Sequence, residues 1–185
     1  MKERPILFTA PMVLAILDGR KTQTWRPIKA PWLTRLEKQR DAVDYAANLM
    51  QVACGCPYGV PGDRLWVRET FIAGWPSEDG EIQQFDEDGN EWPRKVNSCP
   101  VWYRADPSSR EFRWIDRDTG EMRNPPWRSA LHMPRWASRL TLEITDVRVQ
   151  RVNEISEEWD SINAERGFPW DSNPWVWALT FRRLP

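Results

Sequence analysis

The residues Gly19–Arg26, which read Gly-Arg-Lys-Thr-Gln-Thr-Trp-Arg, bring together side chains that could do chemistry. A lysine close to arginines has a lowered pKa, so Lys21 could act as a neutral base, and Thr24 could then attack a carbonyl or bind the resulting oxyanion. In a second interpretation, Lys21 and Arg26 contact phosphates while Thr22 and Thr24 hydrogen-bond at the edge of a strand. The residue types alone are compatible with both.

A further candidate group is the carboxylate of Glu69, in the alternating run Arg64–Phe71. The alternation predicts a strand, and Glu69 shares the more apolar of its two faces with leucine, valine and phenylalanine. In one interpretation, the carboxylate accepts hydrogen bonds from a base edge or pairs with Lys21. In the other it forms a buried ion pair with an arginine, because a buried carboxylate needs a partner.

Tryptophan and arginine are frequent in this chain: 13 of the 185 residues are tryptophan, and most of the 26 basic residues are arginine. Arginine forks grip phosphates and stack on rings, and tryptophan offers a flat face to a base. The structural alternative is that tryptophan fills a small core while arginine solvates the surface. The candidate ligand-binding residues are Arg20, Thr22, Arg26, Trp66, Arg68, Arg135, Trp136, Arg139 and Trp175.

Length and charge limit these possibilities. A chain of 185 residues with 41% hydrophobic and 29% charged residues fits one globular domain. The net charge of -1 and the pI near 6.0 argue against a wholly basic nucleic-acid coat, so any site for a polyanion must be local. No apolar run approaches the roughly 18 residues of a membrane span, and the charged start Met1–Pro5 does not resemble a signal peptide. We expect a cytoplasmic location and no membrane partner.

Three cysteines, Cys54, Cys56 and Cys99, and the single histidine, His132, could in principle supply four metal ligands. The Cys-x-Cys step is tighter than the usual spacing of zinc ligands and the other two residues are scattered, so we expect no metal and no cofactor. The odd number of cysteines also suits a reducing compartment. Any conventional catalytic triad would have to use His132, and no nucleophile elbow is present.

Strands and helices must position these side chains. Pro5–Phe8 reads as an opening strand, and Pro11 begins a helix that ends at Gly19, directly before the basic segment. A peripheral helix is expected from Trp32 to Met50. The basic segment therefore follows a helix stop as a strand or loop.

The strongest strand signal is Arg139–Val152, in which the alternation slips near Asp146 and predicts a β-bulge. A short helix is expected from Ser156 to Gly167, and Trp175–Phe181 reads as the last strand. The order of elements suggests a small mixed barrel with helices at its rim.

Between the first and the second half, the sequence is rich in turn-forming residues. Short hairpins are expected at Ile82–Trp92 and Phe112–Met122, with Val101–Arg104 as a further strand. We therefore interpret residues 1–185 as a single domain with an insertion at about 72–130. This insertion could form a lid or a surface for a partner.

Several ordered segments resemble the ASCH family, a group within the PUA-like superfamily. The resemblance covers most of the chain outside roughly residues 72–100 and extends to the forms found in bacteriophage and prophage genomes. The segments that carry it are Gly19–Thr24, Pro61–Glu69, Leu131–Arg139, Ile144–Val147, Trp170–Trp175 and Val176–Phe181.

The resemblance implies an α+β fold: a PUA-like mixed β-barrel with short flanking helices and a cleft beside the first helix, in a superfamily associated with RNA. Some small bacterial members are metal-independent amidohydrolases that remove the acyl group from N4-acetylcytidine with a lysine, a threonine and a glutamate. The lysine and threonine correspond here to Lys21 and Thr24. Glu165 is the nearest match to the glutamate, followed by Glu158 and Glu157. The chain departs from the pattern in its shortened helix before Gly167 and in Trp25, where phage-type relatives usually carry arginine.

Three hypotheses follow. The first is a protein of the bacterial host's cytoplasm that binds RNA or a modified nucleoside in a cleft beside Gly19–Arg26. The second is a hydrolase for N4-acylated cytidine, with Lys21, Thr24 and either Glu165 or Glu69 as catalytic residues. The third is a phage accessory protein that binds a host protein through the insertion.

Overall fold

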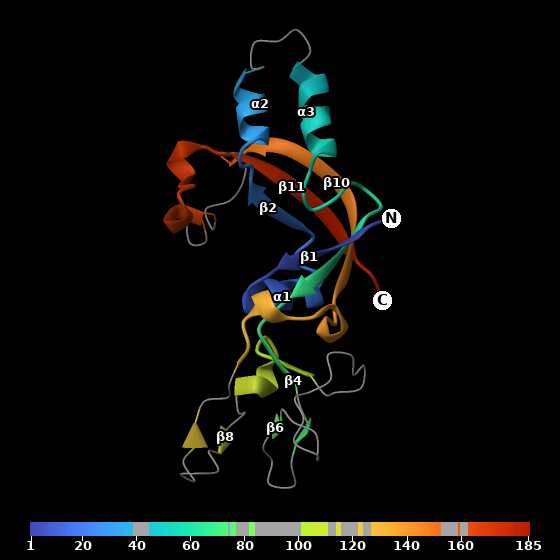
Figure 1. Cartoon of the computed structure of the whole chain (residues 1–185), viewed down its shortest axis with the longest axis vertical. Coiled ribbons are helices and arrows are strands. Elements are labelled where there is room, and N and C mark those ends of the chain that lie inside the picture. The colour runs from blue at the N-terminus through green and yellow to red at the C-terminus, as the bar shows by residue number, and fades with distance from the viewer. Residues whose placement is uncertain are drawn as a thin grey trace. The chain divides into compact units, whose positions relative to one another are not determined.

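The computed structural model describes residues 1–38, 45–73, 75–76, 82–83, 101–110, 114–115, 122–123, 127–152, 159 and 163–185. Its architecture is mixed α+β, as expected, with a five-stranded sheet in the order β1-β3-β10-β11-β2 and three two-stranded sheets (Figure 1). The strands are β1 (Glu3–Leu7), β2 (Gln23–Pro27), β3 (Arg64–Arg68), β4 (Phe71–Ala73), β5 (Trp75–Pro76), β6 (Ile82–Gln83), β7 (Val101–Tyr103), β8 (Trp114–Ile115), β9 (Met122–Arg123), β10 (Thr141–Arg151) and β11 (Trp175–Arg183). The α-helices are α1 (Ala10–Leu17), α2 (Trp32–Lys38) and α3 (Tyr45–Cys54), and the 3-10 helices are η1 (Pro107–Arg110), η2 (Ala130–His132), η3 (Arg135–Ala137), η6 (Ala164–Arg166) and η7 (Trp170–Ser172).

The chain divides into two compact units. Unit 1 consists of Met1–Arg4, Lys21–Leu65 and Thr141–Pro185, and unit 2 consists of Pro5–Arg20 and Trp66–Leu140. The residues that the sequence singles out fall in both units.

The centre of unit 1 is the antiparallel pair of β10 and β11, which curves as one twisted ribbon (Figure 1). Val147 lies opposite Leu179, and the register shifts between Ile144 and Asp146. This irregularity confirms the bulge that the slipped alternation predicts. The expected last strand is also confirmed as β11, in which Trp175–Leu179 is buried on both faces.

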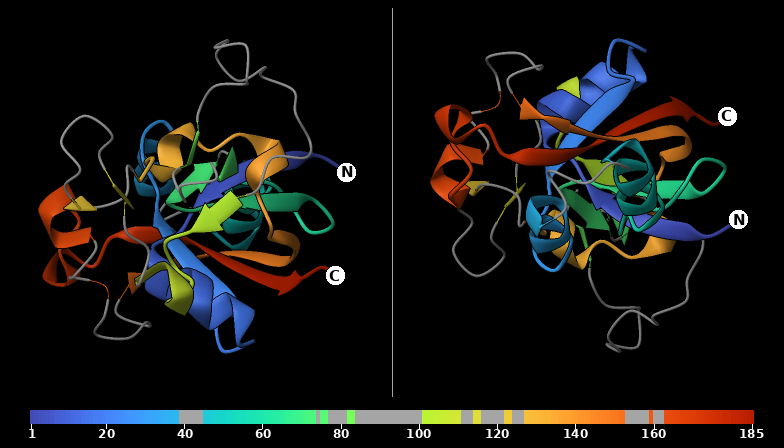
Figure 2. Two further views of the ribbon diagram at one scale, coloured as in Figure 1. Left: turned by 90° about the horizontal axis from the view of Figure 1, so that it is seen from below. Right: turned by 90° about the horizontal axis from the view of Figure 1, so that it is seen from above.

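The stretch 32–50, for which the sequence predicts one helix, instead contributes to the two helices α2 and α3. The two helices lie side by side, which one continuous helix cannot do, and α3 packs against β10 (Figure 1, Figure 2). Trp32 of α2 meets Trp177 of β11 edge to face, with ring centroids 6.4 Å apart. Gly55, just after α3, leaves room for the indole of Trp32, because a Cβ at Gly55 would lie 2.3 Å from it.

Helix α1 lies in unit 2 and confirms the helix that the sequence predicts between Pro11 and Gly19. Thr9 precedes it in an extended conformation and Pro11 occupies its first turn, where the missing N–H of proline costs no hydrogen bond. Gly19 follows with φ +74°, a left-handed conformation that suits glycine after a helix end.

The run Arg64–Phe71, predicted to be one strand, is divided between β3 and β4. The chain leaves the larger sheet after Arg68, because Phe71 pairs with Tyr103 of β7 and its backbone exchanges hydrogen bonds with that of Arg128. The break results from pairing with distant residues, so the local alternation does not reveal it.

The insertion contains short strands where the structure describes it. β8 and β9 pair Trp114 with Arg123, in agreement with the hairpin expected at Phe112–Met122, and β7 confirms the strand expected at Val101. β6 pairs with β5 instead of within Ile82–Trp92, most of which lies outside the described residues.

The predicted helix before Gly167 is described only at its end. η6 stops at Gly167, which has φ +85°, and residues 153–158 and 160–162 lie outside the described part. No helix among the described residues is long and apolar enough to span a membrane.

In the larger sheet, the outer strands are β1 and β2, and no pairing between them is found within the described ranges. The segment after α1 thus supplies an edge strand of this sheet.

Candidate functional site

The edge strand β2 carries the basic segment and pairs with β11. Thr24 lies opposite Leu179, and residues directly opposite in an antiparallel pair share a face. Thr24 is only 3% exposed, on the face where Trp177 meets Trp32 of α2. The next residue, Trp25, points to the other face because side chains alternate along a strand.

On that other face, Trp25 belongs to an aromatic layer. Val152, Trp159 and Val176 form its buried centre, and partly buried rings pack around them. The indole N–H of Trp159 donates to the carbonyl oxygen of Phe168 at 2.7 Å, which fixes the chain between η6 and η7. The partly buried rings are those of Trp25, Phe168 and Trp170.

Two ammonium groups lie over this aromatic layer. Nζ of Lys21 is 5.7 Å from the ring centroid of Trp25, and Nζ of Lys29 is 5.9 Å from that of Phe168. Both distances are within the range of cation–π attraction. We call Lys21, Trp25, Lys29, Phe168 and Trp170 the β2 surface. Lys21 is therefore associated with the face of the sheet opposite to the one that buries Thr24.

Arg26 shares the face of Thr24. Its guanidinium carbon lies 6.0 Å from the ring centroid of Tyr58. Burial lowers the pKa of Arg26; Tyr58 opposes this and Arg166 adds to it. Arginine has such a high pKa that it stays protonated at neutral pH even when burial lowers this pKa, so Arg26 is a partly buried cation.

The flanks of the segment are exposed. Arg20 pairs with Asp18 at 2.8 Å, and the backbone carbonyl of Thr22 accepts a hydrogen bond from Phe181 at 2.9 Å. Glu165 is an exposed residue of η6. None of these three predicted residues is held in the interior.

Trp175 has an arginine partner that the sequence analysis missed. Arg151 lies directly opposite Trp175 in the β10–β11 register, with its guanidinium carbon 4.2 Å from the ring centroid. Nη1 of Arg151 also donates to the carbonyl oxygen of Asn173 at 2.7 Å. Only the register between two distant strands brings this pair together, so no local signal in the sequence could have identified it.

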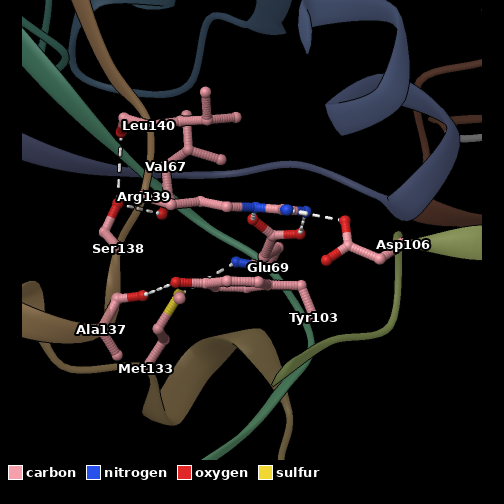
Figure 3. A network of polar contacts seen from close by, with 9 residues as sticks. All are labelled: Val67, Glu69, Tyr103, Asp106, Met133, Ala137, Ser138, Arg139 and Leu140. Atoms are coloured by element: carbon pink, nitrogen blue, oxygen red, sulfur yellow. Dashed lines mark hydrogen bonds and ion pairs between the residues drawn. The ribbon is translucent and has the colours of Figure 1, made fainter. Parts of the chain in front are cut away.

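In unit 2, Glu69 lies in a network of polar contacts (Figure 3). Its side chain is buried, and its two oxygens accept hydrogen bonds from Nε and Nη2 of Arg139 at 2.9 and 3.0 Å. Nη1 of Arg139 donates to Asp106 at 2.6 Å. Glu69 therefore has the arginine partner of the second interpretation, and Arg139, a candidate phosphate ligand, is engaged by two carboxylates.

Tyr103 completes this network from β7. Its ring centroid lies 3.9 Å from the guanidinium carbon of Arg139, and burial raises the pKa of Tyr103 to about 12. Burial also raises the pKa of Glu69, against the opposing effect of Arg139. Burial would lower the pKa of Arg139, but its hydrogen bonds to Glu69 and Asp106 raise it overall. The two carboxylates thus stabilise the cationic form of Arg139, whereas burial disfavours the charged form of Glu69.

The remaining predicted residues gather elsewhere in unit 2. The guanidinium carbons of Arg68 and Arg135 lie 4.7 and 6.0 Å from the ring centroid of Trp66. Trp136, next to Arg135 on η3, is 36% exposed. Four of the predicted ligand-binding residues therefore lie on β3 and η3.

No group of three or more metal-ligating side chains is found among the residues that the structure describes. Cys54 is exposed, whereas Cys56 is buried, and burial raises the pKa of the Cys56 thiol to about 11. Cys99, the third cysteine, lies outside the described residues.

Comparison with protein-family models, curated proteins and solved structures finds no match. Lys29, Phe168 and Trp170 were not singled out by the sequence, because only the folded chain brings them to Lys21 and Trp25. Their chemistry suits a flat ligand with negative charge, since rings stack and ammonium groups attract anions.

Proposed function

We propose that the protein binds RNA or a modified nucleoside on the β2 surface of unit 1, as a PUA-like protein of the ASCH type. The observation that carries this proposal is the set of three partly exposed rings with two ammonium groups over them. Aromatic faces stack unpaired bases, and cations beside them neutralise the phosphates of the same strand. The ordered sequence motifs support the family, and the position of the basic segment on an edge strand supports a PUA-like core.

Binding is favoured over hydrolysis of N4-acylated cytidine. A lysine–threonine–glutamate mechanism needs the three groups within hydrogen-bond reach of one another and of the substrate. Thr24 is buried against the helix-covered face, whereas Lys21 lies over Trp25 on the opposite face. Glu165 is exposed on η6, and Glu69 belongs to unit 2 with Arg139 as its partner.

The test is binding of a fluorescein-labelled single-stranded oligouridylate of about twelve nucleotides, measured by anisotropy. We expect Trp25→Leu, which keeps apolar bulk but removes the ring face, to weaken binding about tenfold. Lys21→Ala should weaken it severalfold and reduce the dependence on salt by about one phosphate contact. Lys2→Ala, which removes an exposed lysine of the same unit, is the matched control and should bind as the unchanged protein does.

Equal binding by Trp25→Leu, Lys21→Ala and Lys2→Ala would contradict the proposal, provided that circular dichroism shows all three to be folded. N4-acetylcytidine serves as a second probe. We expect no release of acetate from it. Release that is abolished by Lys21→Ala would instead identify the protein as an amidohydrolase.

A further inference from the structure

The end of β3 that lies in unit 2 meets η3 in a cluster of one indole and two guanidinium groups. Trp66 and Arg68 are two residues apart on the strand, so their side chains share a face. The guanidinium carbon of Arg68 lies 4.7 Å from the indole centroid, and that of Arg135, from η3, lies 6.0 Å from it. Trp66 is only 8% exposed, so its role here is to support the arginines and not to stack on a ligand.

The guanidinium of Arg68 has N–H groups that donate no hydrogen bond to the described residues. Its Nη1 donates to the carbonyl oxygen of Leu131 at 3.3 Å, and its Nε is buried without a hydrogen-bond partner in the described part of the chain. No carboxylate among the described residues forms an ion pair with Arg68. A guanidinium stacked on an indole keeps its N–H groups at the rim of its plane, where they can grip an oxyanion bidentately.

The carboxylate next to Arg68 in the chain is used elsewhere. Glu69, which follows Arg68 in the chain, holds Arg139 with both of its oxygens, and Asp106 holds the same arginine from the other side. Arg68 and Arg135 are two cations near the same ring, and the negative charge of an anion would attract both.

The network in Figure 3 also connects the chain segments next to the two arginines. The hydroxyl of Tyr103 donates to the carbonyl oxygen of Ala137, the last residue of η3, at 2.9 Å. The hydroxyl of Ser138 donates to the carbonyl oxygen of Val67 at 2.7 Å, and the backbone N–H of Glu69 contacts the sulfur of Met133. Val67 and Glu69 flank Arg68 in the chain. Met133 and Ser138 lie within two residues of η3, so the segment that carries η3 contacts the chain on both sides of Arg68. Preorganisation of this kind lowers the entropic cost of binding.

We propose that Arg68 and Arg135, supported by Trp66, form a binding site in unit 2 for the phosphate oxygens of a phosphomonoester or phosphodiester. The site is made of different residues from the β2 surface and does not depend on it. A free phosphate and the backbone of a single-stranded nucleic acid present the same oxyanion chemistry to it.

The experiment follows the Nε–Hε NMR signals of Arg68 and Arg135, assigned by their loss in Arg68→Lys and Arg135→Lys. Inorganic phosphate and, separately, an oligouridylate of about twelve nucleotides are titrated into the full chain. We expect saturable shifts of both signals. Lysine keeps the charge but loses the stacked fork, so each substitution should weaken binding about tenfold.

Arg148→Lys is the matched control, because Arg148 is an exposed arginine of unit 1 whose partner is Asp146. It should change binding less than twofold, as expected for a surface arginine that keeps its charge. Shifts with both probes, or with the oligouridylate alone, support the site and identify which phosphate source it accepts. No shift with either probe, or equal weakening by Arg148→Lys and Arg135→Lys, would overturn the proposal. Trp25→Leu removes one of the three rings of the β2 surface, so shifts of the Arg68 and Arg135 signals that persist in this variant separate this site from the proposed function.

Discussion

Asp63 organises the turn before β3 through one carboxylate. Its Oδ1 accepts a hydrogen bond from the backbone N–H of Lys2 at 2.7 Å, and its Oδ2 accepts one from the guanidinium of Arg4 at 3.0 Å. These contacts lower the pKa of Asp63, with the hydrogen bond from Lys2 as the largest cause. Gly62, the preceding residue, has φ +89°, a conformation that other side chains rarely adopt. Gly62 and Asp63 therefore have a structural role in the turn before β3, within unit 1.

We expect Asp63→Asn to lower the free energy of unfolding by about 1–2 kcal/mol at neutral pH. The amide keeps only one acceptor oxygen, so one of the two charge-assisted hydrogen bonds becomes a neutral one and the other is lost, because its donor then faces the amide NH2 group. The carboxyl group has a lower pKa in the folded than in the unfolded protein. Its stabilisation is therefore present above the unfolded pKa, near 3.8, and is lost as pH falls through the folded pKa. Urea unfolding of both proteins across this range should show their difference shrinking toward zero in acid. A difference that stays constant would show that the charge is not its cause.

The sequence predicts that a given residue needs a partner better than it predicts which residue that partner is. The alternation around Glu69 predicts that a buried carboxylate needs a cation, and the structure supplies Arg139. The chain has many arginines, so only the fold selects which one. Arg151 and Trp175 illustrate the same limit, because their contact depends on a register between strands about two dozen residues apart in the sequence.

At the scale of elements, sequence periodicity predicts those strands and helix ends that depend on neighbouring residues in the chain. The predictions of β10 with its bulge, of β11 and of the ends of α1 are confirmed. The signals behind them, alternation, proline and glycine, each act within a few residues. The break after β3 and the division between α2 and α3 are missed, because they follow from pairing and packing with distant segments. The barrel that the resemblance implies would depend on contacts of that long-range kind.

The contact between α2 and β11 gives a prediction about packing. A methyl group at Gly55 would lie 2.3 Å from the indole of Trp32, which meets Trp177 edge to face. We expect Gly55→Ala to lower the free energy of unfolding by about 2–3 kcal/mol, because a rigid indole cannot move aside without disturbing this contact. Chemical denaturation would measure the change. The same substitution in a Trp32→Leu background should cost clearly less, since the clash is removed.

Gly62→Ala is the matched control for the steric clash between a side chain at Gly55 and Trp32. No atom lies within 4 Å of a Cβ built at Gly62, so only its φ of +89° opposes the substitution. Its cost should be about 1 kcal/mol and should not change in the Trp32→Leu background. Equal costs for Gly55→Ala with and without Trp32 would show that the clash does not determine the stability.

At the scale of the whole molecule, the candidate residues form two surfaces of different composition. The β2 surface of unit 1 combines lysines with partly exposed rings, whereas the cluster around Trp66 in unit 2 combines arginines with a covered ring. The sequence predicts that any polyanion site is local, because the net charge is -1. It does not predict this division, because residues close in sequence, such as Arg20 and Lys21, belong to different units.

The net charge leads to a prediction for the complete protein. If only a few local cations contact the phosphates, the affinity for a single-stranded oligouridylate should fall gently with salt, because each contact on a single strand contributes about 0.7 to the slope of log K against log salt. We expect a slope of about -1 to -3 between about 50 and 200 mM salt, corresponding to roughly two to four contacts. Anisotropy titrations at several salt concentrations would measure it. A slope steeper than about -5 would require a broad cationic surface and would contradict the prediction of a few local contacts.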